Sequence, residues 1–195
     1  TDRGRCVRAA TAGDGGAGGG GVGGGGGWAA IGVQLTREEG SLMLVIDQSG
    51  SMTNAFGNTS RWRAVRDALV HPQTGVVRTL EGEVRFGLAM YTSHQGFQGG
   101  ACPILRPPLA ATLRGYDAIA RALNAAEPDG DTPTAESVTA ATRLLQTTAP
   151  DEQADIRALV LATDGEPDTC TQPNPGTSAE RDAARAQAVA AVRAA

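Results

Sequence analysis

Residues 42–51 read Leu-Met-Leu-Val-Ile-Asp-Gln-Ser-Gly-Ser, and this stretch decides the fold class. The five apolar residues from Leu42 to Ile46 do not alternate with polar ones, which is typical of a strand buried on both faces. Such strands belong to parallel sheets that helices cover on both sides. The run ends at Asp47, so the sequence predicts a loop at the carboxyl end of this strand that begins with a carboxylate.

The residues downstream predict helices and strands in alternation. Apolar residues recur at helical spacing over 62–69, 116–123 and 138–145, and a final alanine-rich helix is expected over 178–195. Further strands are predicted over 84–90, 104–111 and 156–162. The strand over 104–111 contains Pro107 and Pro108, which cannot donate to a ladder, so it must be an edge strand. This order predicts an α/β fold with a parallel sheet and right-handed crossovers.

The beginning of the chain has a different composition. Twelve of the 27 glycines fall between Gly13 and Gly27, a tract with no side chains to bury. We therefore expect a polar N-terminal segment over 1–12, a flexible linker over 13–30 and one domain over 31–195. The sequence starts at Thr1 rather than at methionine, so the lack of a visible signal peptide says little about export.

Composition excludes several classes of protein. The net charge of −4 argues against general binding of nucleic acid, which depends on neutralising phosphates. The chain has no lysine, which excludes a P-loop, a Ser-x-x-Lys nucleophile and a Schiff base. Its only histidines, His71 and His94, make metal sites built on several histidines improbable. No apolar stretch approaches the length of a membrane span.

Three segments carry oxygen donors. Asp47, Ser49 and Ser51 alternate in the loop after the first buried strand, Thr132 opens a helix, and Asp164 follows the strand over 156–162. In an open α/β sheet, loops at the carboxyl ends of the strands form the usual ligand site. Carboxylates and hydroxyls without cysteine or histidine favour Mg²⁺, Ca²⁺ or Mn²⁺. Because most of these donors are neutral, the ion would keep residual positive charge and room for an outside ligand.

These residues resemble the metal-ion-dependent adhesion site of von Willebrand factor A domains. The likeness rests on Asp47-x-Ser49-x-Ser51, on Thr132 in a Gly-x-Thr segment, and on Thr163-Asp164-Gly165, each after the appropriate element. It covers roughly residues 33–195. The sequence from Asp47 to Met52, together with Trp62 and Tyr91-Thr-Ser93, is similar to that of the bacterial secreted or lipoprotein branch of this family.

The resemblance implies a three-layer α-β-α, Rossmann-like fold, mostly parallel with one antiparallel edge strand. It implies metal ligation by five residues: Asp47, Ser49, Ser51, Thr132 and Asp164. Such domains bind protein partners by accepting an Asp or Glu onto the metal, and most are not enzymes. An extracytoplasmic location (periplasm, cell surface or outer membrane) is favoured over the cytoplasm, and a membrane tether through a preceding N-terminal signal is compatible with this branch.

The chain departs from the family pattern at its C-terminal end. A complete domain carries two more strands and a helix after the helix that begins near Ser178. We therefore expect an incomplete domain in which the strand over 156–162 has an unpaired edge, a surface for aggregation or for a partner.

The cysteines allow two interpretations. Cys102 and Cys170 both lie in loops expected on the same face as the metal site, and in an exported protein they would form a disulfide. The alternative is a pair of unrelated free thiols. Cys6 remains unassigned, because no apolar run precedes it as a lipidated cysteine would require.

Two other functions are weighed against the adhesion module. A Mg²⁺-dependent phosphatase of the haloacid-dehalogenase type also has an aspartate after its first strand, but it needs a second acid where Ser49 stands and a later lysine. A metal-free structural domain would place Asp47 and Asp164 together, where two carboxylates would repel each other.

Several other residues are expected to have structural roles. His94 is interpreted as a solvent-exposed loop histidine, and Thr134 as part of a helix N-cap region. Glu166 and Asp168 are interpreted as acids of a proline-rich turn. The aromatic residues Trp62, Phe86 and Tyr91 are expected in the core or at its boundary.

Overall fold

The strand that contains residues 42–47 lies inside a four-stranded sheet. The computed structural model describes residues 40–94, 100–148 and 156–195. The sheet has the order β5-β4-β1-β6, formed by β1 (Gly40–Asp47), β4 (Val84–Thr92), β5 (Ile104–Thr112) and β6 (Arg157–Ala162). β1 pairs in parallel with β4 and with β6, whereas β5 pairs antiparallel with β4. The predicted sheet, mostly parallel with one antiparallel edge strand, is confirmed.

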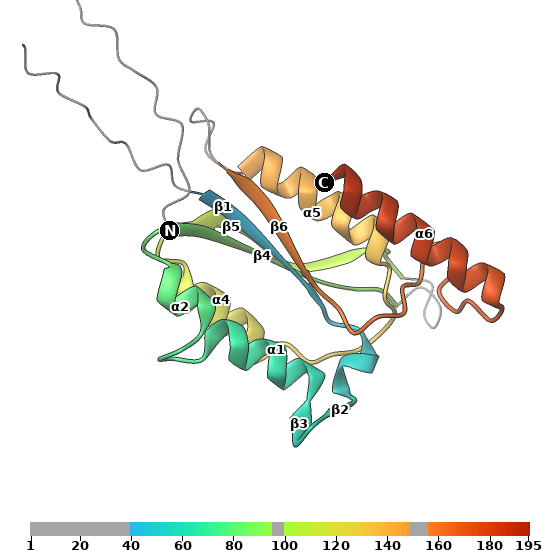
Figure 1. Ribbon diagram of the computed structural model, residues 1–195, viewed down its shortest axis with the longest axis horizontal. Helices are drawn as coiled ribbons and strands as arrows, with labels where there is room; N and C mark the ends of the chain where they lie inside the picture. The colour runs from blue at the N-terminus through green and yellow to red at the C-terminus, as the bar shows by residue number, and fades with distance from the viewer. Residues whose placement is uncertain (1–39, 95–99, 149–155) are drawn as a thin grey trace, which may run out of the picture. The chain divides into compact units, whose positions relative to one another are not determined.

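Helices cover both faces of this sheet. One face carries α1 (Arg61–Val70), α2 (Val76–Leu80) and α4 (Tyr116–Ala125), and the other carries α5 (Thr134–Thr148) and α6 (Ser178–Ala194) (Figure 1). The domain therefore has the three-layer α-β-α arrangement. Within the described part of the chain, no helix is both long and apolar enough to span a membrane.

The core consists of two apolar clusters that share β1. Leu44 and Ile46 pack on one face with Trp62 of α1 and with Ile119 and Leu123 of α4. Met43 and Val45 point to the opposite face, where they pack with Ala141 and Leu145 of α5. Because neighbouring residues of β1 are buried on opposite faces, the run from Leu42 to Ile46 is apolar at every position.

Helix boundaries follow from local signals. The Ser60 hydroxyl accepts a hydrogen bond from the backbone N–H of Arg63 at the start of α1, and α1 ends before His71-Pro72. At the start of α6, Thr177 and Glu180 form a reciprocal capping box.

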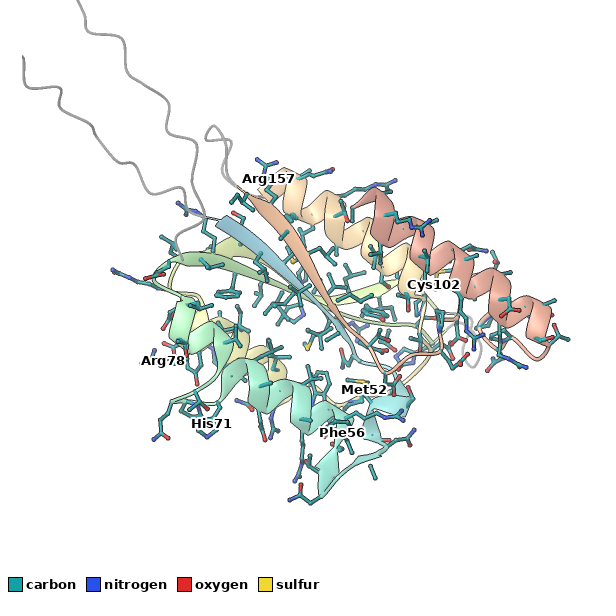
Figure 2. All side chains as sticks on the ribbon, in the orientation of Figure 1. Met52, Phe56, His71, Arg78, Cys102 and Arg157 are labelled. Carbon is teal, nitrogen blue, oxygen red and sulfur yellow. A yellow bond between two sulfur atoms is a disulfide. The ribbon has the colours of Figure 1, made fainter. Side chains whose placement is uncertain are left out.

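Three short elements were not predicted from the sequence. They are α2, the 3₁₀ turn η1 (Gly50–Thr53) and a hairpin of β2 (Ala55–Phe56) and β3 (Thr59–Ser60). Each is too short to show a repeating pattern of apolar residues in the sequence. Phe56 of the hairpin is 62% exposed (Figure 2).

The two outer strands of the described sheet differ in character. β5 contains Pro107 and Pro108 and lies at one edge, as predicted. β6 lies at the other edge, and Val160 on it is 41% exposed. The predicted N-terminal segment 1–12 with Cys6, the linker 13–30 and the expected start of the domain near residue 31 lie outside the described residues.

Candidate metal site

The pairing of β1 with β6 determines where the two predicted carboxylates lie. Ile46 is the register partner of Ala162 in a parallel ladder, so the next residues of both strands emerge at the same end of the sheet. Asp47 is the last residue of β1, and Asp164 follows β6 by two positions. The backbone N–H of Gln48 donates to the carbonyl of Tyr91 on β4 at 2.8 Å, which fixes the first loop to the sheet.

Asp47 is fully buried and hydrogen-bonded through both carboxylate oxygens. The backbone N–H of Ser49 donates to Oδ1 and the hydroxyl of Thr163 donates to Oδ2, each at 2.8 Å. Burial raises the pKa of Asp47, and the nearby charge of Asp164 raises it further. The hydrogen bonds from Ser49 and Thr163 lower the pKa of Asp47 and so oppose the effect of burial.

Two serine hydroxyls join this loop to Asp164. The Oγ atoms of Ser49 and Ser51 are 3.0 Å apart, and the Ser51 hydroxyl donates to Oδ1 of Asp164 at 2.9 Å. The 3₁₀ turn η1, which begins directly after Ser49, places these alternate residues on the same side of the loop. Four of the five predicted ligands, Asp47, Ser49, Ser51 and Asp164, therefore lie in one cluster.

The segment that carries Thr132 lies against the first loop. The backbone N–H of Gly50 donates to the carbonyl of Gly130 at 3.0 Å, and that of Asp129 donates to the carbonyl of Gln48 at 2.8 Å. Gly130 has φ +83°, and a Cβ there would lie 2.2 Å from the Ser93 carbonyl oxygen, so this position requires glycine.

Asp168 holds Thr132 through its backbone. The Thr132 N–H donates to Oδ2 of Asp168 at 3.1 Å, and the Asp168 N–H donates to the Thr132 carbonyl at 2.8 Å. Burial raises the pKa of Asp168 to about 6, and the charges of Asp131, Asp47 and Glu166 raise it as well. The interpretation of Asp168 as a mere turn acid therefore needs correction. Thr132 is itself buried.

Arg61 is a second residue that sequence reasoning missed. Its Nη1 lies 2.6 Å from Oδ2 of Asp164, so Ser51 and Arg61 bind the two oxygens of one carboxylate. Arg61 is the first residue of α1, and no local pattern in the sequence relates it to a residue more than 100 positions away.

Neighbouring residues support the site in ways the sequence indicated only partly. The Tyr91 hydroxyl lies 3.2 Å from that of Thr134, and burial raises the pKa of Tyr91 well above its usual range. Thr134 is the first residue of α5, and its hydroxyl also donates to the Thr132 carbonyl.

His94 was expected to be solvent-exposed, but it is half-buried and its Nδ1 lies against Gly130. Glu166 forms an exposed ion pair with Arg185 at 2.7 Å.

A disulfide connects two loops beside the site. Cys102 and Cys170 are joined with Cα atoms 5.5 Å apart, which corresponds to the first of the two interpretations of these cysteines. The backbone N–H of Cys170 donates to Oε1 of Glu136 on α5 at 2.8 Å. The loop that contains Asp168 is thus fixed both to the segment before β5 and to α5.

The donor atoms fit a hard divalent cation. The hydroxyls of Ser49 and Ser51 and the Asp164 carboxylate form a chain of hydrogen bonds, and the Asp47 carboxylate accepts from the backbone N–H of Ser49. Oxygen donors of this kind suit Mg²⁺, Ca²⁺ or Mn²⁺. Among the residues described, no group of three or more His, Cys, Asp or Glu side chains could hold a metal ion. Any ion held here therefore depends on the hydroxyls.

Comparison with solved structures gives relatives of the same fold. The pilus adhesin SpaC from Lactobacillus rhamnosus GG, in its open conformation, is 27% identical with a TM-score of 0.52, over 69% of this chain and 16% of that one. The PilB minor pilin from Streptococcus sanguinis is 17% identical with a TM-score of 0.59, over 83% of this chain and 48% of that one. The chain thus matches less than half of either relative.

Sequence comparison identifies the family directly. Among curated proteins, none matches the sequence significantly. The family profile of the von Willebrand factor type A domain matches residues 42–166, which include most of β1, all of β4, β5 and β6, and the Thr163-Asp164-Gly165 segment. Together with the three-layer fold, this match shows that the chain belongs to the von Willebrand factor type A domain family.

Proposed function

We propose that the domain is a protein-binding module of the adhesion type that depends on a divalent metal ion. Asp47, Ser49, Ser51, Thr132 and Asp164 would hold Mg²⁺, or Ca²⁺ or Mn²⁺ in its place. The bound ion would supply a Lewis-acidic position for an aspartate or glutamate of the partner. The observation that carries the proposal is the chain of contacts of 3.0 Å or less from Asp47 through Ser49 and Ser51 to Asp164.

The hydrogen bonds around the cluster support a site that is preorganised for an ion. Both oxygens of Asp47 are oriented by protein donors, so this carboxylate does not have to be ordered when the ion binds. Asp168 positions the backbone of Thr132. The charge of Asp164 raises the pKa of Asp47, and a bound cation would offset this repulsion.

The relatives support adhesion and an extracytoplasmic location. One similar structure is a pilus adhesin and the other a minor pilin, and both names describe surface appendages. The Cys102–Cys170 disulfide agrees with an oxidising compartment. A phosphatase of the haloacid-dehalogenase type remains disfavoured, because position 49 is a serine and no lysine exists in the chain.

Thermal unfolding in the presence and absence of metal tests the proposal. The wild-type chain in excess chelator is compared with samples in Mg²⁺, Mn²⁺ and Ca²⁺. An ion at one hundred times its Kd should add about 2.7 kcal/mol to the free energy of unfolding. Asp47→Asn should abolish this gain, whereas Asp117→Asn, which changes an exposed acid of α4, should retain it.

Partner binding forms the second part of this test. Immobilised peptides that present Asp or Glu should retain the wild-type chain in Mg²⁺ and release it on addition of chelator. The corresponding Asn and Gln peptides serve as the control. A wild-type protein whose unfolding is indifferent to all three ions would contradict the proposal.

A further inference from the structure

The ion pair between Arg61 and Asp164 places a fixed positive charge at the candidate metal site. Arg61 Nη1 lies 2.6 Å from Oδ2 of Asp164, whose side chain is only 7% exposed, while that of Arg61 is 36% exposed. Ser51 binds the other oxygen of the same carboxylate. A protein cation therefore contacts one of the two proposed carboxylate ligands.

The position of Arg61 is set by the same loop that carries the serines. Its backbone N–H donates to the Asn54 carbonyl at 3.0 Å, and the Asn54 N–H donates to the Ser51 carbonyl at 2.9 Å. The Ser60 cap fixes the first turn of α1 from the other side. Arg61 is thus anchored by its backbone to the first loop, whereas its side chain is partly exposed and has solvent into which it can move.

Electrostatics determines what this guanidinium does to a divalent ion. An arginine stays protonated at all relevant pH values, so its charge cannot be removed by titration. A cation bound near Ser51 and Asp164 would lie a few ångströms from that charge and would be repelled by it. The ion and Arg61 would therefore compete for the Asp164 carboxylate.

We propose that Arg61 is an internal competitor of the metal ion. Its guanidinium occupies Asp164 in the metal-free protein, stabilises that state, and leaves Asp164 when a divalent cation binds. The affinity for the ion is consequently lower than the oxygen donors alone would give. This inference rests on the proposed metal site and adds to it the residue that sets its affinity.

Isothermal titration of Mn²⁺ and of Mg²⁺ into the chelator-stripped full chain tests the inference. We expect Arg61→Gln to bind each ion on the order of tenfold more tightly than wild type, because one repelling charge is removed. Arg61→Lys keeps the charge and should bind no more tightly than wild type. Arg66→Gln is the matched control on the same helix, since within the described part of the chain the half-buried Arg66 pairs with its exposed neighbour Asp67. It should titrate like wild type.

Thermal unfolding supplies a readout that is independent of affinity. In chelator, Arg61→Gln should melt at a lower temperature than wild type, because Asp164 loses its ion-pair partner. The increase in melting temperature on adding Mn²⁺ should then be larger for the variant. Added salt should reduce the difference in affinity between the two proteins, since screening weakens the repulsion.

The outcomes separate this inference from the proposed function. If wild type binds metal and Arg61→Gln binds it equally or more weakly, Arg61 is not a competitor, and only this inference fails. If neither protein binds metal, the proposed function fails as well.

A measurement on the wild type covers the case in which Arg61→Gln does not fold in chelator. The side-chain Nε–H signal of Arg61, assigned by its absence from Arg61→Lys, should shift in ¹⁵N NMR spectra as Mg²⁺ saturates the protein. An unchanged signal at saturation would overturn the inference.

Discussion

The Thr163 hydroxyl donates a hydrogen bond to Oδ2 of Asp47 at 2.8 Å, although 116 positions separate the two residues in the sequence. The contact exists because β1 and β6 are parallel neighbours that end at the same level of the sheet. Thr163 is therefore the residue through which the last strand of the described sheet holds the central carboxylate of the candidate site.

Thr163→Val should destabilise the domain, because it removes a hydrogen bond to Asp47 while keeping the shape of the side chain. Asp47 would lose one of its two described hydrogen bonds while staying buried, which should lower the free energy of unfolding by about 1–2 kcal/mol. Denaturation by urea in the presence of chelator measures this difference. Thr147→Val is the control, because the described hydrogen bonds of the Thr147 hydroxyl are to carbonyls of its own helix. An effect no larger than that of the control would show that the Thr163 contact contributes nothing.

Asp168 should make the metal-free protein less stable as the pH rises from about 4 to 6. Its pKa is raised from the ordinary value to about 6, so the folded state holds a proton that the unfolded state has already released. The contribution is fully present below the unfolded pKa and is lost as the pH passes the folded pKa. Because the side chain is half-exposed, we expect a difference on the order of 1 kcal/mol.

Asp168→Asn removes this titration and is compared with Asp117→Asn in chelator. The free energy of unfolding of Asp168→Asn should fall less steeply between pH 4 and 6 than that of wild type. The Asp117→Asn curve should run parallel to that of wild type. Identical slopes in all three proteins would rule out a shifted pKa at Asp168.

Loss of the Cys102–Cys170 disulfide should affect both stability and the site. The bond closes a loop across 68 positions, and bonds of this kind contribute about 2–4 kcal/mol. A double Cys→Ala variant, made together with Cys6→Ser to prevent thiol exchange, should lose this amount relative to Cys6→Ser alone. Its affinity for Mn²⁺ should fall too, because the loop of Cys170 carries Asp168, which holds Thr132. Unchanged affinity would show that the disulfide acts on stability alone.

Val160→Lys should reduce self-association without unfolding the domain. Val160 is exposed on the outer strand β6, on the face opposite Leu159 and Leu161, which pack in the core. A charge on an edge strand opposes pairing with another chain. Light scattering at increasing protein concentration should show less association for Val160→Lys than for wild type. Lys substitution at Val189 of α6, which is also exposed, tests whether the effect belongs to the strand edge.

The sheet and much of the site could be predicted because they depend on strong local patterns. The unbroken apolar run before Asp47 indicated a strand buried on both faces, and the prolines of β5 indicated an edge. Parallel strands bring their carboxyl ends together, so Asp47 and Asp164 were expected to be neighbours from their positions after two such strands.

The missed residues have contacts that no local pattern encodes. Arg61 reaches Asp164 only because η1 and the small hairpin position the start of α1 beside the first loop. Asp168 and Thr132 meet through loop backbone, where neither helical nor strand periodicity applies. The requirement for glycine at Gly130 likewise arises from the close approach of the Ser93 carbonyl.

The two edges of the described sheet are not equivalent. On β5, Pro107 and Pro108 have no amide hydrogens to offer, so a hydrogen-bonded ladder cannot run on without interruption there. The six residues of β6 are all of a kind that carries an amide hydrogen. Growth of this sheet by added polypeptide would therefore be directional: it would proceed outward from β6, next to the loop that carries Asp164 of the candidate metal site.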